Sequence, residues 1–182
     1  MDFQSVTAKL VPIMKSQSTF IMMVGLPGSG KSTFLRGLVE RLDAELVIAS
    51  TDDLIEKKAA EEGITYSEMF GKVHFKQLKA QMNREIAEAV AANKHIALDQ
   101  TNMSRKSRMS KMQEIPETYT RVCLNFSVDE TVLKRRLDER AKQTGKVIPD
   151  FVMKNMISSF DPITKAEGFN FVFDVDNTKN IT

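Results

Sequence analysis

A nine-residue glycine-rich segment places the strongest constraint on what this chain can fold into. Residues 25–33 read Gly-Leu-Pro-Gly-Ser-Gly-Lys-Ser-Thr, which is the pattern G-x-x-x-x-G-K-S. An apolar run at 20–24 precedes the segment, and residues 34–39 with helical periodicity follow it. Glycines between a buried strand and a helix let backbone N–H groups converge on a phosphate at the positive end of the helix dipole. The segment therefore predicts a phosphate-binding loop for a nucleoside triphosphate.

Two side chains of this loop have predicted tasks of their own. Lys31 would reach the outer phosphates of ATP, and the Ser32 hydroxyl would ligate Mg²⁺. A glycine-rich turn after an ordinary core strand is the alternative, but the strand and helix on either side argue against it. We therefore expect ATP and Mg²⁺ as cofactors. The other residues expected to contact ATP are Gly25, Pro27, Gly28, Ser29, Gly30 and Thr33.

Length and composition fit a single compact domain. A chain of 182 residues can bury a full core, and its single cysteine, Cys123, excludes an internal disulfide framework. No apolar run approaches the roughly 18 residues of a membrane span, and the first residues lack a secretory signal. We expect a cytoplasmic monomer. Apolar residues at helical spacing predict that residues 1–17 form a helical extension, with one domain over 18–182.

Strand and helix patterns alternate along the chain. Five apolar segments are typical of strands: 20–24, 45–50, 95–98, 121–126 and 169–175. Helices are predicted between or beside them at 31–42, 67–92, 127–141 and 149–158, the third opened by a capping box from Ser127 to Glu130. Strands joined by helical crossovers predict an α/β fold, a five-stranded parallel sheet with helices on both faces.

Acidic residues follow two of these strands. Asp52 comes directly after the second strand, where a carboxylate could accept the proton of an attacking hydroxyl next to the phosphates. The alternative for Asp52 is an N-cap of the next helix, a role that Asp53 fits better. Asp99 closes the third strand, where an acid would orient Mg²⁺ through water; its alternative is a turn or cap residue.

The net charge of +2 conceals two basic segments. Four cations lie within seven residues after the third strand, and a second group spans 134–146. Both groups follow strands, so we expect them at the edge where α/β sheets bind ligands. Helical spacing places Arg105 and Arg108 on one side, where they would contact a nucleic-acid backbone. The alternative for each group is a solvated helix face. The first group is Arg105, Lys106, Arg108 and Lys111.

Five segments together carry a family resemblance. They resemble the kinase domain of the bacteriophage-type polynucleotide 5′-hydroxyl kinases, over about residues 18 to 176. The Asp-x-Thr-Asn stretch and the Glu-Gly-Phe stretch are more specific than the shared phosphate-binding loop. The segments are 47–53, 96–102, 134–140, 148–153 and 160–169.

The resemblance implies a P-loop kinase fold and roles for individual residues. Asp52 would be the general base on the 5′-hydroxyl of DNA or RNA. Arg140 would be the arginine of a lid at about 140–150 that contacts the transferring phosphoryl group. Arg136, one helical turn earlier, would lie against the adenine or the phosphates. Two further residues, Thr101 and Asn102, would line the substrate side of the cleft.

Two departures from the family leave the substrate open. The arginine that grips a 3′-phosphate in the phage enzymes, three residues after the catalytic aspartate, is Ile55 here. The insertion at 61–75 has no match in the family. A kinase of the same fold acting on another hydroxyl is the alternative: a hydroxymethylated base in phage DNA such as 5-hydroxymethyluracil, a nucleotide or a sugar nucleotide. A switch module is a third reading, against which Asp52 and Arg140 argue, because a switch needs no base aimed at an acceptor.

Overall fold

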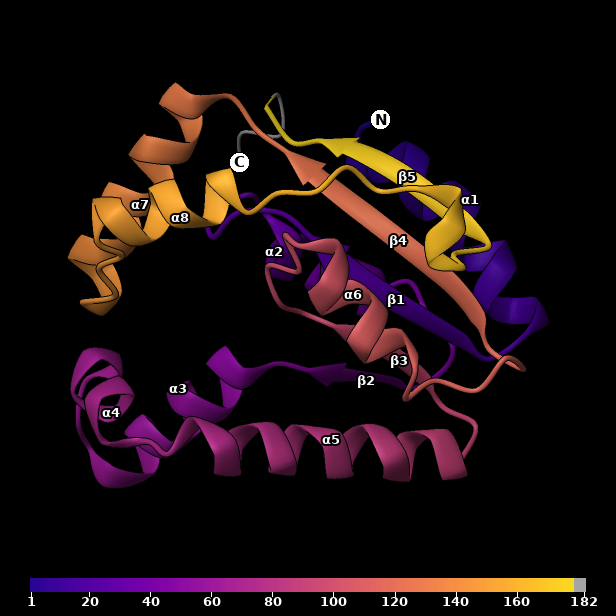
Figure 1. Cartoon of the computed structure of the whole chain (residues 1–182), viewed down its shortest axis with the longest axis horizontal. Coiled ribbons are helices and arrows are strands. Elements are labelled where there is room, and N and C mark those ends of the chain that lie inside the picture. Colours follow the sequence, from indigo (N-terminus) through magenta and orange to yellow (C-terminus); the bar gives the residue numbers. More distant parts are fainter. Residues whose placement is uncertain (179–182) are drawn as a thin grey trace.

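The computed structural model describes residues 1–178, so the last four residues of the predicted domain, 179–182, lie outside the described part. Five strands form one sheet in the order β2-β3-β1-β4-β5, and all four neighbouring pairs are parallel (Figure 1). The predicted parallel α/β sheet is confirmed. The strands are β1 (Thr19–Val24), β2 (Leu46–Ala49), β3 (His95–Leu98), β4 (Thr120–Ser127) and β5 (Phe171–Asp176).

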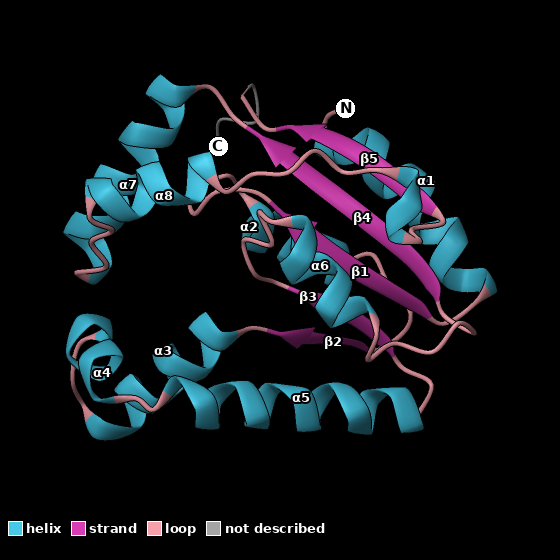
Figure 2. Cartoon of the chain, viewed as in Figure 1, coloured by secondary structure: helices cyan, strands magenta, loops and turns pink. Residues whose placement is uncertain are grey.

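Helices cover both faces of the sheet (Figure 2). One face carries α1 and α2 over the β1 side chains Ile21 and Met23. The other face carries α3, α4 and α5 over Phe20 and Met22. β1 is therefore buried on both sides, as a central parallel strand requires. The helices are α1 (Phe3–Ser16), α2 (Lys31–Val39), α3 (Thr51–Glu62), α4 (Tyr66–Lys72), α5 (Phe75–Ala91), α6 (Arg105–Met112), α7 (Glu130–Thr144) and α8 (Asp150–Ser158), with a 3₁₀ turn at Lys165–Glu167.

The predicted helix at 67–92 is two helices in the structure. A capping box between Thr65 and Glu68 opens α4, and Val73 takes an extended conformation that ends it. Both Met69 and Leu78 are buried in the core. Nine residues apart at 100° each, they would point to opposite sides of one continuous helix. The break after α4 lets both side chains reach the same core.

The start of α7 also differs from the prediction. Ser127 pairs with Asp176 in the sheet, so it belongs to β4 and caps nothing. The N-cap is Asp129, whose carboxylate accepts hydrogen bonds from the N–H groups of the first turn. The helix then runs three residues past the predicted end and stops at Gly145, which has a positive φ of 70°.

The topology places two helical pairs beside the carboxyl ends of the strands. β1 lies at the centre with β3 on one side and β4 on the other, so the chain order reverses there. In open α/β sheets ligands bind at such a point. In Figure 1, α3 and α4 lie on one side of the strand ends, and α7 and α8 on the other. No helix within residues 1–178 is long and apolar enough to cross a membrane.

Candidate functional site

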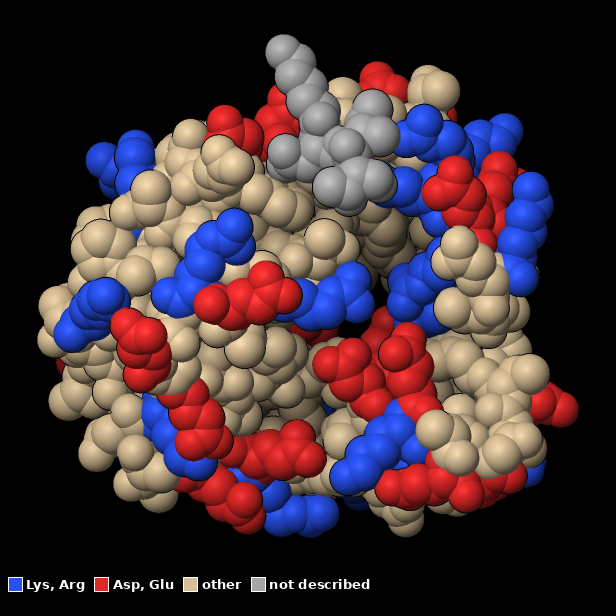
Figure 3. All heavy atoms as spheres, turned by 180° about the vertical axis from the view of Figure 1, so that it is seen from behind, with Lys and Arg blue, Asp and Glu red and all other residues tan. Residues whose placement is uncertain are grey.

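A hollow of about 1740 Å³ lies at the carboxyl ends of the strands. Its walls come from the phosphate-binding loop, the start of α3, α4, the loop after β3, the end of α7, and α8. In the space-filling view of Figure 3, acidic side chains gather on one side of a hollow and basic side chains on the other. Typical ligand pockets measure about 300–1,000 Å³. This hollow therefore has room for ATP together with a second substrate.

The phosphate-binding loop is held in shape by a side chain from beyond β5. The Asn177 amide donates a hydrogen bond of 2.8 Å to the carbonyl oxygen of Ser29. Gly30 has a φ of 97°, and a Cβ atom there would lie 1.9 Å from the Asn177 amide nitrogen. Only glycine satisfies both the backbone conformation and this close approach. The loop is thus fixed by the end of the chain's last strand.

Lys31 lies at the base of the hollow. Its ammonium group donates hydrogen bonds of 2.9 Å to the carbonyl oxygens of Gly25 and Leu26. Burial lowers the pKa of Lys31 to about 8, although the nearby carboxylates of Asp99 and Asp52 oppose this effect. A phosphate arriving beside this desolvated cation would supply a favourable charge partner. The geometry therefore suits the phosphate contact predicted for Lys31.

Ser32 and Asp99 come together although 67 residues separate them. The Ser32 hydroxyl donates a hydrogen bond of 2.6 Å to the Asp99 carboxylate. Hydroxyl and carboxylate oxygens are ligands that Mg²⁺ accepts, and Mg²⁺ usually takes its remaining ligands from water and substrate phosphates. Within residues 1–178, no group of three or more His, Cys, Asp or Glu could hold a metal without such help. The pair fits Mg²⁺ carried in with ATP.

The loop after β3 supports the phosphate-binding loop. The Thr101 carbonyl accepts a 3.0 Å hydrogen bond from the N–H of Gly25. The buried Asn102 amide donates a 2.7 Å bond to the carbonyl of Met23, and its oxygen accepts from Lys111. We predicted that Thr101 and Asn102 line the substrate side. Both residues border the hollow, and the hydrogen bonds of the Asn102 side chain also position the loop. Their contact with substrate stays a prediction.

Asp52 lies in the first turn of α3 and faces the hollow. Its carboxylate accepts a 2.9 Å hydrogen bond from the Tyr66 hydroxyl and forms a 2.6 Å ion pair with Lys146. The Lys146 ammonium also lies 3.8 Å from the centre of the Tyr66 ring. The N-cap of α3 is Ser50, whose hydroxyl accepts from the N–H of Asp53. Neither aspartate is therefore the cap that we considered.

The surroundings of Asp52 set its charge. Burial raises the pKa of this carboxyl, but Lys146 and then Tyr66 outweigh it and bring the pKa below its usual value. Asp53, next along the chain, has no such partners, and burial followed by repulsion from Asp99 and Glu56 raises its pKa. The surroundings of Asp52 thus favour its ionised form where it faces the hollow.

Sequence reasoning missed Tyr66 and Lys146. Lys146 stood among the cations of the 134–146 group without a role, and Tyr66 lies in the insertion at 61–75. Lys146 is 94 residues from Asp52, so no local spacing links them. The sequence offered one weak indication that Lys146 belongs to the site, its position directly after Gly145, the C-cap of α7.

Removing the Lys146 charge should shift the pH dependence of catalysis. In Lys146→Met, burial of Asp52 is no longer outweighed by the ion pair, so the pKa of Asp52 rises. The acid limb of the kcat/KM profile, which reports the free enzyme, should move to higher pH. Lys142→Met removes an exposed lysine of α7 and should leave the limb in place. An unmoved limb in Lys146→Met would show that Lys146 does not act on Asp52.

Three arginines of α7 border the hollow, and two of them, Arg136 and Arg140, have predicted roles. Arg140 approaches Glu56 of α3, with 3.6 Å between the guanidinium and carboxylate. Arg136 donates a 3.2 Å hydrogen bond to the carbonyl of Asn177, beside the phosphate-binding loop. Both positions agree with the region predicted for a lid arginine and an adenine or phosphate contact; their roles stay predictions.

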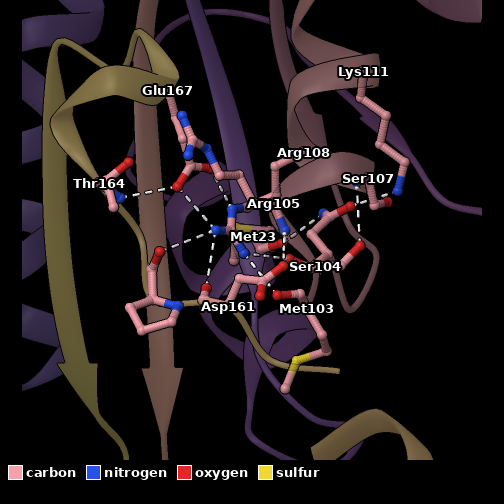
Figure 4. A network of polar contacts seen from close by, with 12 residues as sticks. Met23, Met103, Ser104, Arg105, Ser107, Arg108, Lys111, Asp161, Thr164 and Glu167 are labelled. Atoms are coloured by element: carbon pink, nitrogen blue, oxygen red, sulfur yellow. Dashed lines mark hydrogen bonds and ion pairs between the residues drawn. The ribbon is translucent and has the colours of Figure 1, made fainter. Parts of the chain in front are cut away.

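The prediction that Arg108 contacts nucleic acid is wrong. Its side chain is 0% exposed and forms a two-bond ion pair with Glu167, at 2.6 and 2.9 Å (Figure 4). The same guanidinium donates to the carbonyls of Met103 and Asp161. Helical periodicity shows which residues share a side, but not whether that side faces solvent. Arg105 is exposed, and its backbone N–H is bound by the Asp161 carboxylate.

A family described as an AAA domain matches residues 20–163. The chain belongs to this AAA domain family. The match covers the phosphate-binding loop, Asp52 and Asp99 at their strand ends, and helices α7 and α8. Two curated relatives are shikimate kinases. The one from Paracidovorax citrulli (strain AAC00-1) is 26% identical over 168 residues, which cover 92% of this chain and 88% of the relative. The one from Corynebacterium jeikeium (strain K411) is 32% identical over 111 residues, 61% of this chain and 55% of the relative. The matched part of this chain thus spans little more than half the length of the Corynebacterium jeikeium shikimate kinase.

Solved structures share the fold. A chain of the Pnkp1/Rnl/Hen1 RNA repair complex matches with a TM-score of 0.63 and 23% identity, over 85% of this chain and 50% of that one. A gluconokinase from Sinorhizobium meliloti 1021 matches with a TM-score of 0.51 and 20% identity, over 87% and 82%. At these sequence identities the likeness shows that the chain has the P-loop kinase fold. It carries no information about the substrate.

Proposed function

We propose that this AAA domain protein is a kinase that uses Mg²⁺ and ATP to phosphorylate a hydroxyl group. The observation that carries the proposal is the ionised Asp52 carboxylate facing the same hollow as Lys31 and the Ser32–Asp99 pair. A nucleotide switch needs no carboxylate aimed at an acceptor. The family and its shikimate kinase relatives support the same reaction class.

The residues of the hollow divide the reaction between them. Asp52 would accept the proton of the acceptor hydroxyl as its oxygen forms a bond to the γ-phosphorus of ATP. The bond from that phosphorus to the bridging oxygen breaks, and ADP leaves. Lys31 and Arg140 would offset negative charge on the transferring group. When bound, Mg²⁺ adds further positive charge at the phosphates of ATP.

For the acceptor, we propose a hydroxyl other than a 5′-OH end: that of a hydroxymethylated base, a nucleotide or a sugar nucleotide. Ile55, which replaces the phosphate-gripping arginine of the phage enzymes, is buried in the core. Arg108 is buried as well. The surface therefore lacks two basic side chains expected to grip a nucleic-acid end: an arginine at position 55 and the side chain of Arg108. We further propose that the protein acts as a monomer in the cytoplasm, where ATP is available.

Labelled ATP and a panel of acceptors test this proposal. The panel holds 5-hydroxymethyluracil in duplex DNA, mononucleotides, a sugar nucleotide, shikimate, gluconate, and 5′-OH DNA and RNA. We expect transfer to one of the first three, dependent on Mg²⁺. Efficient labelling of 5′-OH ends would reverse the choice of acceptor, and no transfer to any hydroxyl would contradict the kinase proposal.

A 5′-OH polynucleotide is the second candidate, favoured by exposed Arg105 and Lys106 on α6, next to Ser104 and Ser107 of the hollow. Each phosphate contact to a single strand adds about −0.7 to the slope of log K against log salt. For a 5′-OH oligonucleotide, this candidate predicts a slope of about −1.4 from two contacts, lost in the Arg105→Ala/Lys106→Ala variant. An equal slope in variant and parent would exclude it.

Arg140→Ala should lower kcat by about a hundredfold and change the Kd of ATP little. The arginine sits near the end of α7 and approaches Glu56 in this state, so it must turn toward the phosphates as the lid closes. Charge supplied only as the transition state forms raises kcat rather than lowering KM. Steady-state kinetics and ATP titration check this, with Lys134→Ala on the same helix as the control. Normal kcat with a raised KM would remove Arg140 from the catalytic residues.

A further inference from the structure

Large apolar side chains line one part of the hollow and are left exposed. Phe70 of α4 is 47% exposed, Phe151 of α8 is 66% exposed, and Val147 before α8 is 69% exposed. α8 has no buried residue at all, although Val152 and Met156 also face the hollow. A cluster of apolar side chains around a cavity marks a ligand site more often than scattered exposed ones do.

The rings on the α4 side are held in place. Tyr66 and Phe70 lie 5.9 Å apart with their planes tilted by 32°, and Phe75 meets Phe70 edge-on at 5.0 Å. The Tyr66 hydroxyl is fixed on Asp52, and the Ser67 hydroxyl donates a 2.8 Å hydrogen bond to the carbonyl of Gly145 in the lid. Hydrogen bonds therefore connect the aromatic residues of α4 both to the proposed base, Asp52, and to Gly145 in the proposed lid.

The charged side chains of the hollow are unevenly distributed around these rings. The α3 and α4 residues that border the hollow include no lysine or arginine; they are Thr51, Asp52, Asp53, Glu56, Tyr66, Ser67 and Phe70. From α8 come only uncharged side chains. Lys146 is paired with Asp52 and Glu56, at 2.6 and 3.5 Å. Other cations border the hollow from α7 and from the phosphate-binding side, among them Arg140, which lies 3.6 Å from Glu56. The α4 and α8 side chains that flank the rings themselves carry no charge.

We infer that the reactive hydroxyl of the acceptor is carried next to a flat ring. The ring would lie between Phe70 of α4 and Phe151 of α8, and the hydroxyl would point to Asp52. This inference rests on the proposed kinase function and specifies its substrate class. The ring can belong to a free molecule or to a residue of a polymer, since both present the same chemistry.

Acceptor preference tests the inference. The probes are 5-hydroxymethyluridine as the free ring alcohol, the same base in duplex DNA, and shikimate and gluconate as anionic alcohols without an aromatic ring. We expect kcat/KM for one ring probe to exceed that for the anions by about tenfold or more. In the Phe70→Ala and Phe151→Ala variants, the KM of the ring probe should rise by about five- to tenfold with the KM of ATP unchanged. Ile157→Ala, an exposed α8 residue away from the hollow, is the matched control.

The two possible failures are distinguishable. A preference for shikimate or gluconate, or a ring-probe KM unchanged in both phenylalanine variants, would overturn the inference while the kinase function stands. If no probe is phosphorylated, calorimetric titration of 5-hydroxymethyluridine in the presence of ADP decides. Saturable binding that Phe70→Ala weakens would uphold the ring site although the kinase proposal fails, and no saturable binding would overturn it.

Discussion

Replacing Asp52 with asparagine is expected to lower kcat by about 10²- to 10⁴-fold, the range for a lost general base. Asparagine keeps the size of the side chain and can still accept the hydrogen bond from Tyr66. It cannot take up the proton of an acceptor hydroxyl. The Kd of ATP should change little, because the nucleotide contacts are expected from the phosphate-binding loop. Single-turnover kinetics with the preferred acceptor and ATP titration measure both quantities.

Two comparisons sharpen this test. The variant removes one partner of buried Lys146, which keeps Glu56 at 3.5 Å, so folding should be checked by thermal unfolding. Asp53→Asn alters the neighbouring carboxylate, which also borders the hollow but binds neither Tyr66 nor Lys146 in the described contacts. An Asp52→Asn variant that retains most of its activity would show that this carboxylate is not the base. An equal loss of kcat in Asp53→Asn would show that the effect does not identify Asp52 as the base.

Arg108→Ala is expected to lower the free energy of unfolding by about 3–5 kcal/mol, because it leaves the Glu167 carboxylate buried without its partner. Domains of this kind are stable by only about 5–15 kcal/mol, so the variant should unfold at much lower urea. Burial raises the pKa of Glu167, but Arg108 and the Thr164 N–H outweigh it and lower the pKa. The stability from this pair is present above the unfolded pKa of glutamate, about 4.3, and is lost as the pH falls through the lower folded value.

A matched control lies one turn away on the same helix. Arg105→Ala removes an exposed arginine and keeps the backbone N–H that binds Asp161, so its effect should stay within about 0.5 kcal/mol. Replacing both partners, as in Arg108→Met/Glu167→Leu, should recover much of the loss, since a well-packed apolar pair is often as stable as a buried ion pair. Equal stability of Arg108→Ala and the parent would contradict the buried ion pair.

The Glu-Gly-Phe stretch shows how a motif can be recognised without its purpose being known. Its resemblance to the polynucleotide kinases marked the family but assigned the stretch no role. In the structure, Glu167 binds Arg108, Gly168 takes a positive φ of 85°, and Phe169 packs against the core. The stretch joins α6 and the loop after β3 to the approach of β5. Its contacts here are structural, and they position the loop that carries Thr101.

Local patterns in the sequence determined the phosphate-binding loop, the five strands, and the placing of Asp52 and Asp99 at strand ends. Each depends on residues close together in the chain, because strand and helix periodicity and glycine spacing are local properties. Only the tertiary structure decided which distant side chains meet. Arg108 became a buried ion pair, and Tyr66 and Lys146 closed around Asp52 across 14 and 94 residues. Such pairs form where the packing of helices on the sheet brings distant residues together. The spacing of residues along the chain does not predict these contacts.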